Sequence, residues 1–381
     1  MKRFWQFCSY LLVAVVAFCI ALYLAGNSNG AYPKLAELKT VIDRYFVDEV
    51  DHAAVEDAAA RAMVEALGDR WSYYMTAEEY KAYQESMANA YVGIGVTITQ
   101  REDGYITVIK TEPDGPAAEA GIMPGDVITT VGDQDISTLD LDQIKDMVKG
   151  KEGTKVKLKL LRDEKILEME VERRTIHSTV AKGQMLDDGI GLVTIVNFDS
   201  RCAEETLAAI EELLEQGADA LIFDVRFNPG GYKKELTKIL DYLLPEGPLF
   251  RSVDYNGKES VDMSDANCLQ IPMAVLINGD SYSAAEFFGA ALSEYGVAKL
   301  VGQPTTGKGH FQTSFNLSDG SAAVISIGRY CTPNGVSLSD MGLTPDILVE
   351  VDEETYQNIY LGAVKPQDDP QVQAAIAVLS E

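Results

Sequence analysis

Ser283 lies where a predicted strand gives way to a predicted helix. The apolar run 273–277 predicts a buried strand, and residues 284–295 predict a helix. The N–H groups at the start of a helix can bind an oxyanion, so a serine at this place is well sited to attack a carbonyl group. Glu286, three residues on, gives the alternative that Ser283 belongs to a capping box, and both interpretations fit.

Lys308 lies between two glycines after another predicted strand. The segment from Gly302 nearly matches a phosphate-binding loop, but Gly309 replaces the residue that would hold magnesium, and residues 311–317 predict a strand instead of a helix. Glycines let the backbone approach closely, and a lysine buried there can lose its proton and act as a general base for a serine. His310 is the competing base, and no local acidic residue supports it.

A third junction, at residues 224–231, offers backbone donors. A predicted strand runs into Pro229, Gly230 and Gly231, and the N–H groups of such a turn are free to point at an anion. Alone, this pattern indicates only a loop. Because Ser283 lies at a similar junction, the turn at 224–231 is a candidate part of the same site.

These junctions need a layered α/β domain to bring them together. From about residue 190 strands alternate with helices, which predicts a mostly parallel sheet covered by helices, with the active site where strands end and helices begin. The predicted strands are 191–196, 220–225, 273–277, 299–301 and 322–327, and the predicted helices are 204–215, 235–244 and 284–295. Residues 35–90 predict helices, the third of them at 77–89. Residues 91–163 predict short strands and one helix at 140–148.

The length, charge and cysteine content of the chain exclude several classes of function. The 381 residues are enough for two or three domains, and 46% of them are hydrophobic, which predicts folded cores. With 59 acidic and 32 basic side chains, the formal charge is −27, which argues against nucleic-acid binding through phosphate neutralisation. The five cysteines form no CxxC spacing, which argues against a zinc site or a disulfide framework.

The N-terminus predicts a membrane anchor. Lys2 and Arg3 precede an apolar run over residues 5–25, which is long enough to cross a bilayer and places the N-terminus in the cytoplasm and the body of the protein outside it. The alternative is a cleaved signal peptide, which would make the body a secreted protein.

Further motifs accompany Ser283 and Lys308, and in chain order they are 92–95, 115–126, 224–231, 278–286, Gln312, 330–335 and 342–346. Together they resemble the motifs of the carboxy-terminal processing peptidases, also called tail-specific proteases, and the two within 91–165 resemble a PDZ domain. The sequence departs from the family pattern at Arg70-Trp71, Tyr282 and Ala285, and none of these departures removes a catalytic group.

The resemblance implies a role for each of these residues. Ser283 would attack the scissile carbonyl, Lys308 would take its proton and Gln312 would orient Lys308. The N–H groups of Ala284 and of Gly230 or Gly231 would form the oxyanion hole. A substrate's apolar C-terminus would add as a strand to the PDZ domain, with its carboxylate held by the backbone of Val92, Gly93, Ile94 and Gly95. No metal or organic cofactor is implied.

The implied fold is mixed α/β. It has a catalytic core like that of Clp proteases and crotonases, an inserted β-rich PDZ domain and an N-terminal helical segment. The expected divisions are an anchor or signal segment at 1–26, a helical region at 31–90, the PDZ domain at 91–165, the catalytic domain at 166–365 and a helical tail at 366–381. The tail could serve a homodimer through an amphipathic helix at 372–379.

Three alternatives remain beside a serine protease. One is a catalytically silent PDZ scaffold on a protease fold, although Ser283, Lys308 and Gln312 are all present. A nucleotide-hydrolysing enzyme would use the near phosphate loop. An acyl-CoA enzyme of the crotonase type would share the α/β layers but would not explain the PDZ domain or the anchor.

Overall fold

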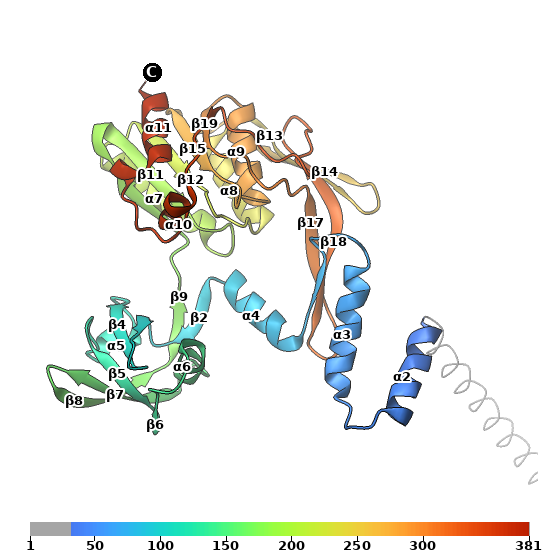
Figure 1. Ribbon diagram of the computed structural model, residues 1–381. Coiled ribbons are helices and arrows are strands. Elements are labelled where there is room, and N and C mark those ends of the chain that lie inside the picture. The colour runs from blue at the N-terminus through green and yellow to red at the C-terminus, as the bar shows by residue number, and fades with distance from the viewer. Residues whose placement is uncertain (1–31, 381) are drawn as a thin grey trace, which may run out of the picture. The chain divides into compact units, whose positions relative to one another are not determined.

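The computed structural model describes residues 32–380 and consists of two compact units, one ending at Gly68 and the other beginning at Asp69 (Figure 1). The membrane span predicted at 5–25 lies outside the described residues. Within residues 32–380, no helix is both long and apolar enough to cross a bilayer.

The first unit, in its described part, holds two helices, α2 (Pro33–Tyr45) and α3 (His52–Glu65). Pro33 begins α2, where its fixed φ suits the first turn and its missing N–H costs nothing. Asp51 caps α3 by accepting the backbone N–H of Ala54 at 3.1 Å. The helices predicted from periodicity in this part of the chain are therefore present.

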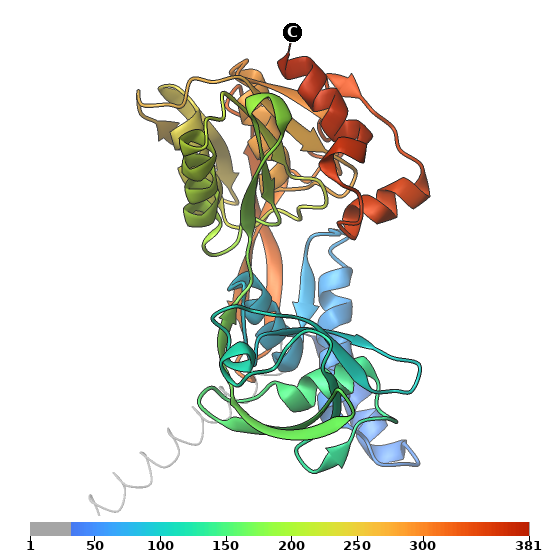
Figure 2. The same cartoon turned by 90° about the vertical axis from the view of Figure 1, so that its left-hand side faces the viewer.

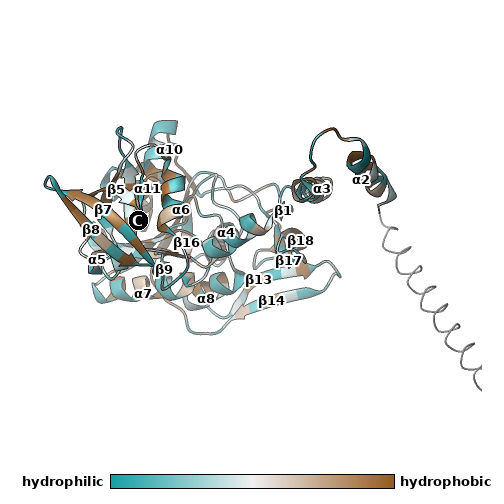
Figure 3. Ribbon diagram, turned by 90° about the horizontal axis from the view of Figure 1, so that it is seen from below, coloured by the Kyte–Doolittle hydropathy of each residue, from teal (hydrophilic) through white to brown (hydrophobic). Residues whose placement is uncertain are grey.

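The β-rich domain of the second unit is an antiparallel sheet with the strand order β3-β4-β5-β7-β8. Its elements are β3 (Val96–Gln100), β4 (Ile106–Thr111), α5 (Pro116–Glu119), β5 (Val127–Val131), β6 (Gln134–Asp135), α6 (Leu141–Val148), β7 (Lys155–Arg162) and β8 (Lys165–Glu172). Side chains of β7 alternate between buried and exposed, as predicted, and the β7–β8 hairpin carries both hydrophobic and hydrophilic segments (Figure 3). Ile128, Ile144 and Leu160 are fully buried between sheet and helix. The outer edge of β3 pairs with no other described strand.

Two short strands carry the chain into and out of this domain. β2 (Ala90–Gly93) and β9 (Arg174–His177) pair antiparallel, with Ala90 opposite His177. The β-rich domain is therefore an insertion whose two connections run side by side.

A second, mostly parallel sheet has the strand order β10-β11-β12-β15-β16-β19, in which only β10 runs antiparallel to its neighbour. Its strands are β10 (Ala181–Met185), β11 (Ile190–Ile195), β12 (Ala220–Asp224), β15 (Met273–Ile277), β16 (Ala298–Gly302) and β19 (Ile347–Leu348). The accompanying helices are η1 (Asp187–Gly189), α7 (Cys202–Glu215), α8 (Lys233–Leu243), α9 (Ala284–Glu294), α10 (Glu353–Tyr360), η2 (Pro366–Asp368) and α11 (Pro370–Leu379). The predicted parallel sheet with covering helices is confirmed.

Both faces of this sheet are buried. Leu221 and Phe223 of β12 pack in a core with α7, α8 and α9, whereas Ala220 and Ile222 pack on the other face with α11. Figure 2 shows α11, in red, on the opposite side from the green helix α7. Alternation of this kind explains why β12 is apolar at nearly every position.

The C-terminal helix α11, predicted as a possible dimer interface, packs on the parallel sheet of its own chain. Val372 and Ala375 are buried against the chain's own sheet. The apolar face expected to be available to a second copy of the chain is therefore covered within one chain, and the helix belongs to the α/β layers.

A third sheet, antiparallel, completes the α/β part. Its strands are β1 (Tyr73–Met75), β13 (Gly247–Asp254), β14 (Glu259–Ser264), β17 (His310–Asn316) and β18 (Ala322–Cys331). β1, which was not predicted, pairs with β18 so that Tyr73 lies opposite Val324. The region 31–90, predicted as one helical segment, is thus divided at Gly68, and its later part, including α4 (Ala77–Met87), belongs to the second unit.

Candidate active site

One pocket of about 1100 Å³ in the second unit gathers the residues for which chemistry was predicted. Its lining includes, together with residues of β1, α4, β13, β17 and β18, all six predicted catalytic and oxyanion residues: Gly230, Gly231, Ser283, Ala284, Lys308 and Gln312. Residues from three distant parts of the sequence therefore meet at the ends of the parallel strands, where such folds place their sites.

The backbone at Ser283 is strained. Its φ of 59° and ψ of −125° fall in a region that residues with a Cβ rarely adopt, at a cost of about 1–3 kcal/mol. The preceding turn holds it there: Asn278 Oδ1 accepts the N–H groups of Phe227 and Asp280, and Ser281 Oγ donates to Val225 O at 2.8 Å. Such a sharp strand-to-helix turn exposes the serine hydroxyl above the helix N-terminus, as in nucleophile elbows.

Tyr330 is the hydrogen-bond partner of the serine hydroxyl. Ser283 Oγ and Tyr330 Oη lie 2.9 Å apart. Tyr330 is buried against the rings of Phe250 and Phe287, and burial raises its pKa, so it stays protonated at neutral pH. No role was predicted for Tyr330. The only signal for it in the sequence was its place in the motif 330–335.

Glu286 joins the two segments that carry Ser283 and Lys308. It is fully buried, and its Oε2 accepts the backbone N–H groups of Ser283 and Lys308, both at 2.9 Å. Its Oε1 accepts the Thr305 hydroxyl at 2.5 Å and the Gly307 N–H at 2.7 Å. The predicted cap on α9 is thus also a clamp on the loop that carries Lys308.

The same clamp rules out the phosphate-loop alternative. The N–H groups of Gly307 and Lys308, which would face a phosphate, instead donate to the Glu286 carboxylate. The chain then continues as strand β17, as predicted, instead of the helix that a phosphate loop requires.

Replacing Glu286 with glutamine is expected to lower the kcat/KM of the reaction at this site by about 100-fold, because the amide cannot accept all four donors and the two segments shift relative to each other. The free energy of unfolding should fall by about 1–3 kcal/mol. Steady-state kinetics and denaturant unfolding measure both effects.

Glu294→Gln is the matched control. Glu294 lies on the same helix and also ties it to a loop, by accepting from Thr332 Oγ1 and Asn334 N, but that loop does not carry Lys308. Equal loss of activity in the two variants would contradict a specific role for Glu286.

The Lys308 ammonium group lies against two aromatic rings that also contact each other. Its Nζ lies 4.8 Å from the ring centre of Trp71 and 5.7 Å from that of Tyr282. Burial lowers its pKa to about 8, against the opposing charges of Asp69 and Glu286. Both rings stand at positions that depart from the resembled family's pattern. The rings of Trp71 and Tyr282 contact the ammonium group of Lys308. In the described chain no hydrogen bond joins this group to Ser283.

The glycine turn fits tightly beside the serine. A Cβ on Gly230 would lie 2.7 Å from Ser283 Cβ, and one on Gly231 would lie 2.3 Å from the Phe198 carbonyl carbon, so only glycine fits at either place. Gly230 N–H donates to Asn228 Oδ1 at 2.8 Å. The N–H groups of Gly231 and Ala284 have no acceptor among the described residues, so these two are open to an oxyanion.

A buried arginine fixes this turn from behind. The Arg226 guanidinium lies 2.6 Å from Asp224, and it reaches Asp369 and Gln371 at the start of α11 at 2.9 Å each. The C-terminal helix therefore supports the turn that carries Gly230 and Gly231.

Gln312 does not contact Lys308 in this structure. Its Nε2 donates to His310 O and Ser326 Oγ, both at 3.0 Å, while its side chain lines the same pocket. Its predicted role in orienting Lys308 stays a prediction. The competing base His310 is absent from the pocket lining, and its Nδ1 lies 3.4 Å from Ser339 Oγ.

The predicted carboxylate-binding residues lie beside the open edge of β3. Val92 and Gly93 pair with β9. Ile94 is buried in the core of the β-rich domain, and Gly95 has a positive φ of 74°. Within residues 32–380 the N–H groups of Ile94 and Gly95 have no acceptor, which leaves donors where an added strand would end.

Comparison with known proteins agrees with this arrangement. The model of peptidase family S41 matches residues 189–349, and that of the PDZ domain matches residues 92–172. The chain is 30% identical over 355 residues to the carboxy-terminal processing protease CtpA of Bacillus subtilis, covering 90% of this chain and 76% of that protein. It is 33% identical over 307 residues to the "Probable CtpA-like serine protease" of Staphylococcus epidermidis, covering 79% of this chain but only 62% of that relative.

One solved structure shares the fold. A "Putative S41 protease" from Bacteroides fragilis is similar with a TM-score of 0.52 and 14% identity, covering 84% of this chain and 90% of that one. The photosystem II D1 C-terminal processing protease aligns with a TM-score of 0.49 and 25% identity, covering 84% and 88% of the two chains.

Proposed function

This chain belongs to the carboxy-terminal processing proteases of peptidase family S41, and from that membership we propose that Ser283 and Lys308 carry out its peptide hydrolysis and that its PDZ domain binds substrate C-termini. The enzyme is a serine-type protease with a PDZ domain. The observation that carries the assignment of residues is the single pocket in which a strained serine, a lysine of lowered pKa and two unpaired N–H groups meet.

In the proposed reaction, neutral Lys308 takes the hydroxyl proton as Ser283 Oγ bonds to the scissile carbonyl carbon. The N–H groups of Ala284 and Gly231 stabilise the oxyanion. The C–N bond then breaks, the leaving amine takes the proton from Lys308, and the acyl group remains on Ser283. Water then attacks the ester and gives one proton to Lys308. Lys308 passes this proton to Ser283 Oγ as the C–O bond breaks, and the acid product releases its remaining proton to solvent and leaves as a carboxylate.

This mechanism needs Lys308 to leave its place against the rings of Trp71 and Tyr282. The lysine side chain has a flexible four-carbon stem, so in the proposed reaction Nζ would move to the serine while Glu286 holds the backbone of Lys308. Gln312, on the wall of the same pocket, would then receive the lysine in its active position.

The PDZ domain would select substrates by their ends. An extended C-terminus added to the open edge of β3 would place its carboxylate at the N–H groups of Ile94 and Gly95, with Val92 and Gly93 leading into the site.

The proposal includes a membrane anchor at the N-terminus. The apolar run at 5–25, preceded by Lys2 and Arg3, would hold the enzyme at the membrane with its catalytic body outside the cytoplasm. Its substrates would then be extracytoplasmic proteins with accessible ends.

The test compares three versions of one unstructured reporter protein, ending in a free apolar C-terminus, in the same residues with a C-terminal amide, or in acidic residues. The full chain is expected to cleave the free apolar version roughly tenfold faster than the other two, through KM. Equal cleavage of all three would contradict tail recognition while leaving the protease intact. A folded enzyme that cleaves none of them would favour the catalytically silent scaffold.

A further inference from the structure

Asp199 is a buried carboxylate on the wall of the active-site pocket. The residue is only 6% exposed, and its Oδ1 has no hydrogen-bond partner in the described part of the chain. It is also the one acidic residue among those that line the pocket. A charge that is removed from water and left unpaired is costly, so its presence here requires an explanation.

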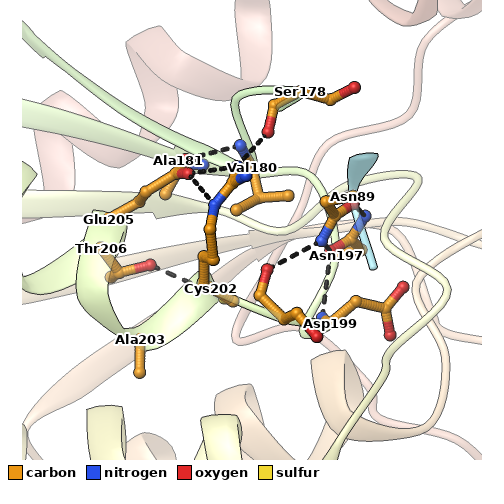
Figure 4. A network of polar contacts seen from close by, with 12 residues as sticks. Asn89, Ser178, Val180, Ala181, Asn197, Asp199, Cys202, Ala203, Glu205 and Thr206 are labelled. Atoms are coloured by element: carbon orange, nitrogen blue, oxygen red, sulfur yellow. Dashed lines mark hydrogen bonds and ion pairs between the residues drawn. The ribbon is translucent and has the colours of Figure 1, made fainter. Parts of the chain in front are cut away.

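The backbone of Asp199 is held in place by a network of polar contacts. Asn89 and Asn197 exchange side-chain hydrogen bonds of 3.1 and 2.8 Å, and Asn197 Oδ1 accepts the Asp199 N–H at 3.0 Å. In Figure 4 a dashed line reaches the backbone nitrogen of Asp199 and none reaches its carboxylate. The backbone of Asp199 is therefore fixed, while Oδ1 of its carboxylate has no hydrogen-bond partner in the described chain.

Asp199 lies next to the reacting centre. Gly230 and Gly231 are consecutive: a Cβ on Gly230 would meet Ser283, and a Cβ on Gly231 would lie 2.7 Å from Asp199 N. Because consecutive Cα atoms are about 3.8 Å apart, the Asp199 backbone is within roughly one residue length of the oxyanion turn. A peptide bound with its scissile carbonyl at this turn would bring a side chain near that carbonyl to the Asp199 carboxylate.

No ion pair joins a cation to this carboxylate within residues 32–380. Arg70 stacks on Trp71, and Lys308 Nζ lies against the rings of Trp71 and Tyr282. Lys233, the remaining pocket cation, pairs with Asp262 at 2.8 Å. Burial alone raises the pKa of Asp199 to about 7, with no lowering by any positive group.

The surroundings suit a long cationic side chain. Tyr80 and Tyr83 of α4 line the pocket with their rings stacked 6.3 Å apart, and Tyr232 lines it from the turn after Gly231. The negative charge of Asp199 acts on the hydroxyls of Tyr83 and Tyr232, which places both close to it. Aromatic walls bind the aliphatic stem of lysine or arginine and attract its charge, while the carboxylate pairs with the head group.

We propose that Asp199 forms a specificity subsite that takes a lysine or arginine side chain of the substrate, close to the scissile bond. This inference rests on the proposed function, since it needs a peptide bound at Ser283. The active site would then select the residue near the scissile bond, in addition to the selection of the C-terminus expected from the PDZ domain.

The test uses unstructured reporter proteins that share one free apolar C-terminus. Mass spectrometry first maps the cleavage sites in a mixed-sequence reporter, and the enriched position is then varied as lysine or methionine in an otherwise identical pair. At pH 8, where Asp199 is ionised, the full chain is expected to cleave the lysine version about tenfold or more faster in kcat/KM. Asp199→Asn should bring that ratio to about one, because cleavage of the lysine version slows.

Asp187→Asn is the matched control, since Asp187 is exposed and lies outside the pocket lining, and it should keep the wild-type ratio. Folding of Asp199→Asn is checked by thermal unfolding at pH 8, where removal of an unpaired buried charge should leave the melting temperature equal or higher. A wild-type enzyme without preference for basic residues at any mapped position would overturn the inference. So would an equal loss on both substrates in Asp199→Asn. No cleavage at all by the wild type would overturn the proposed function itself, and the inference with it.

Discussion

Ser283→Ala is expected to lower kcat/KM for a tailed protein substrate by about 10⁴-fold or more, because the acyl-enzyme can no longer form and only binding and the oxyanion donors remain. The fold should survive. The strained backbone at residue 283 is held through its N–H by Glu286 and by the turn before it, neither of which uses the hydroxyl. Loss of the hydrogen bond to Tyr330 should cost about 1 kcal/mol of unfolding free energy.

The measurement is single-turnover and steady-state cleavage of the free apolar reporter, with a denaturant titration of each variant. Ser318→Ala, at an exposed serine outside the pocket lining, is the control and should behave as the wild type. Retention of more than a few per cent of wild-type activity by a folded Ser283→Ala enzyme would show that another nucleophile is used.

Lys308→Met is expected to lower kcat/KM by about 10³-fold or more, since the group proposed to take the serine proton is removed. Lysine acts as a base only when neutral, and its pKa is about 8. In the wild type, kcat/KM should therefore rise with pH and reach half of its plateau near pH 8. The variant should lose this rise along with its activity.

Stability gives an independent readout of the same group. The pKa of Lys308 is lower in the folded state than the ordinary 10.5, so protonation opposes folding below about pH 8, and this penalty disappears as the pH approaches 10.5. Lys308→Met should thus unfold at an equal or higher temperature than the wild type at pH 7, with the difference shrinking at higher pH.

Two control variants separate the possible explanations of a loss in Lys308→Met. Lys233→Met removes another pocket cation, one already paired with Asp262, and should retain most of the activity. His310→Asn removes the competing base. If His310→Asn abolished cleavage while Lys308→Met did not, the assignment of the base would be wrong.

Local patterns predicted the parallel sheet and singled out Ser283, Lys308 and the turn at 224–231, whereas Gln312 was identified only through the resemblance to a known family. The runs that became β12, β15 and β16 are apolar because both faces of the sheet are covered, and Ser283 and Gly230 follow two of those strands directly. Parallel strands end at the same edge of a sheet, so residues that follow them must converge.

Contacts between distant segments could not be predicted in the same way. A serine followed three residues later by Glu286 reveals a cap, but nothing local shows that the same carboxylate also binds Gly307 and Lys308. β1 is only three residues long, too short for a periodicity, and is defined by its partner β18. Similarly, the apolar face of α11 indicated burial without showing that the chain's own sheet would cover it.

The pairing of β1 with β18 has a consequence for the order in which the enzyme is made. Ser72 Oγ accepts the N–H of Ser326, 254 residues later in the chain, and Trp71 beside it forms the pocket wall against Lys308. At synthesis rates of about 5–20 residues per second, β18 is synthesised well over ten seconds after β1. The PDZ domain can fold in that interval, but the pocket cannot close around its lysine until residue 330 has emerged. The active-site pocket of a nascent chain is therefore incomplete during most of synthesis. The unfolded segments of the same chain leave the ribosome before a pocket that could cleave them has formed.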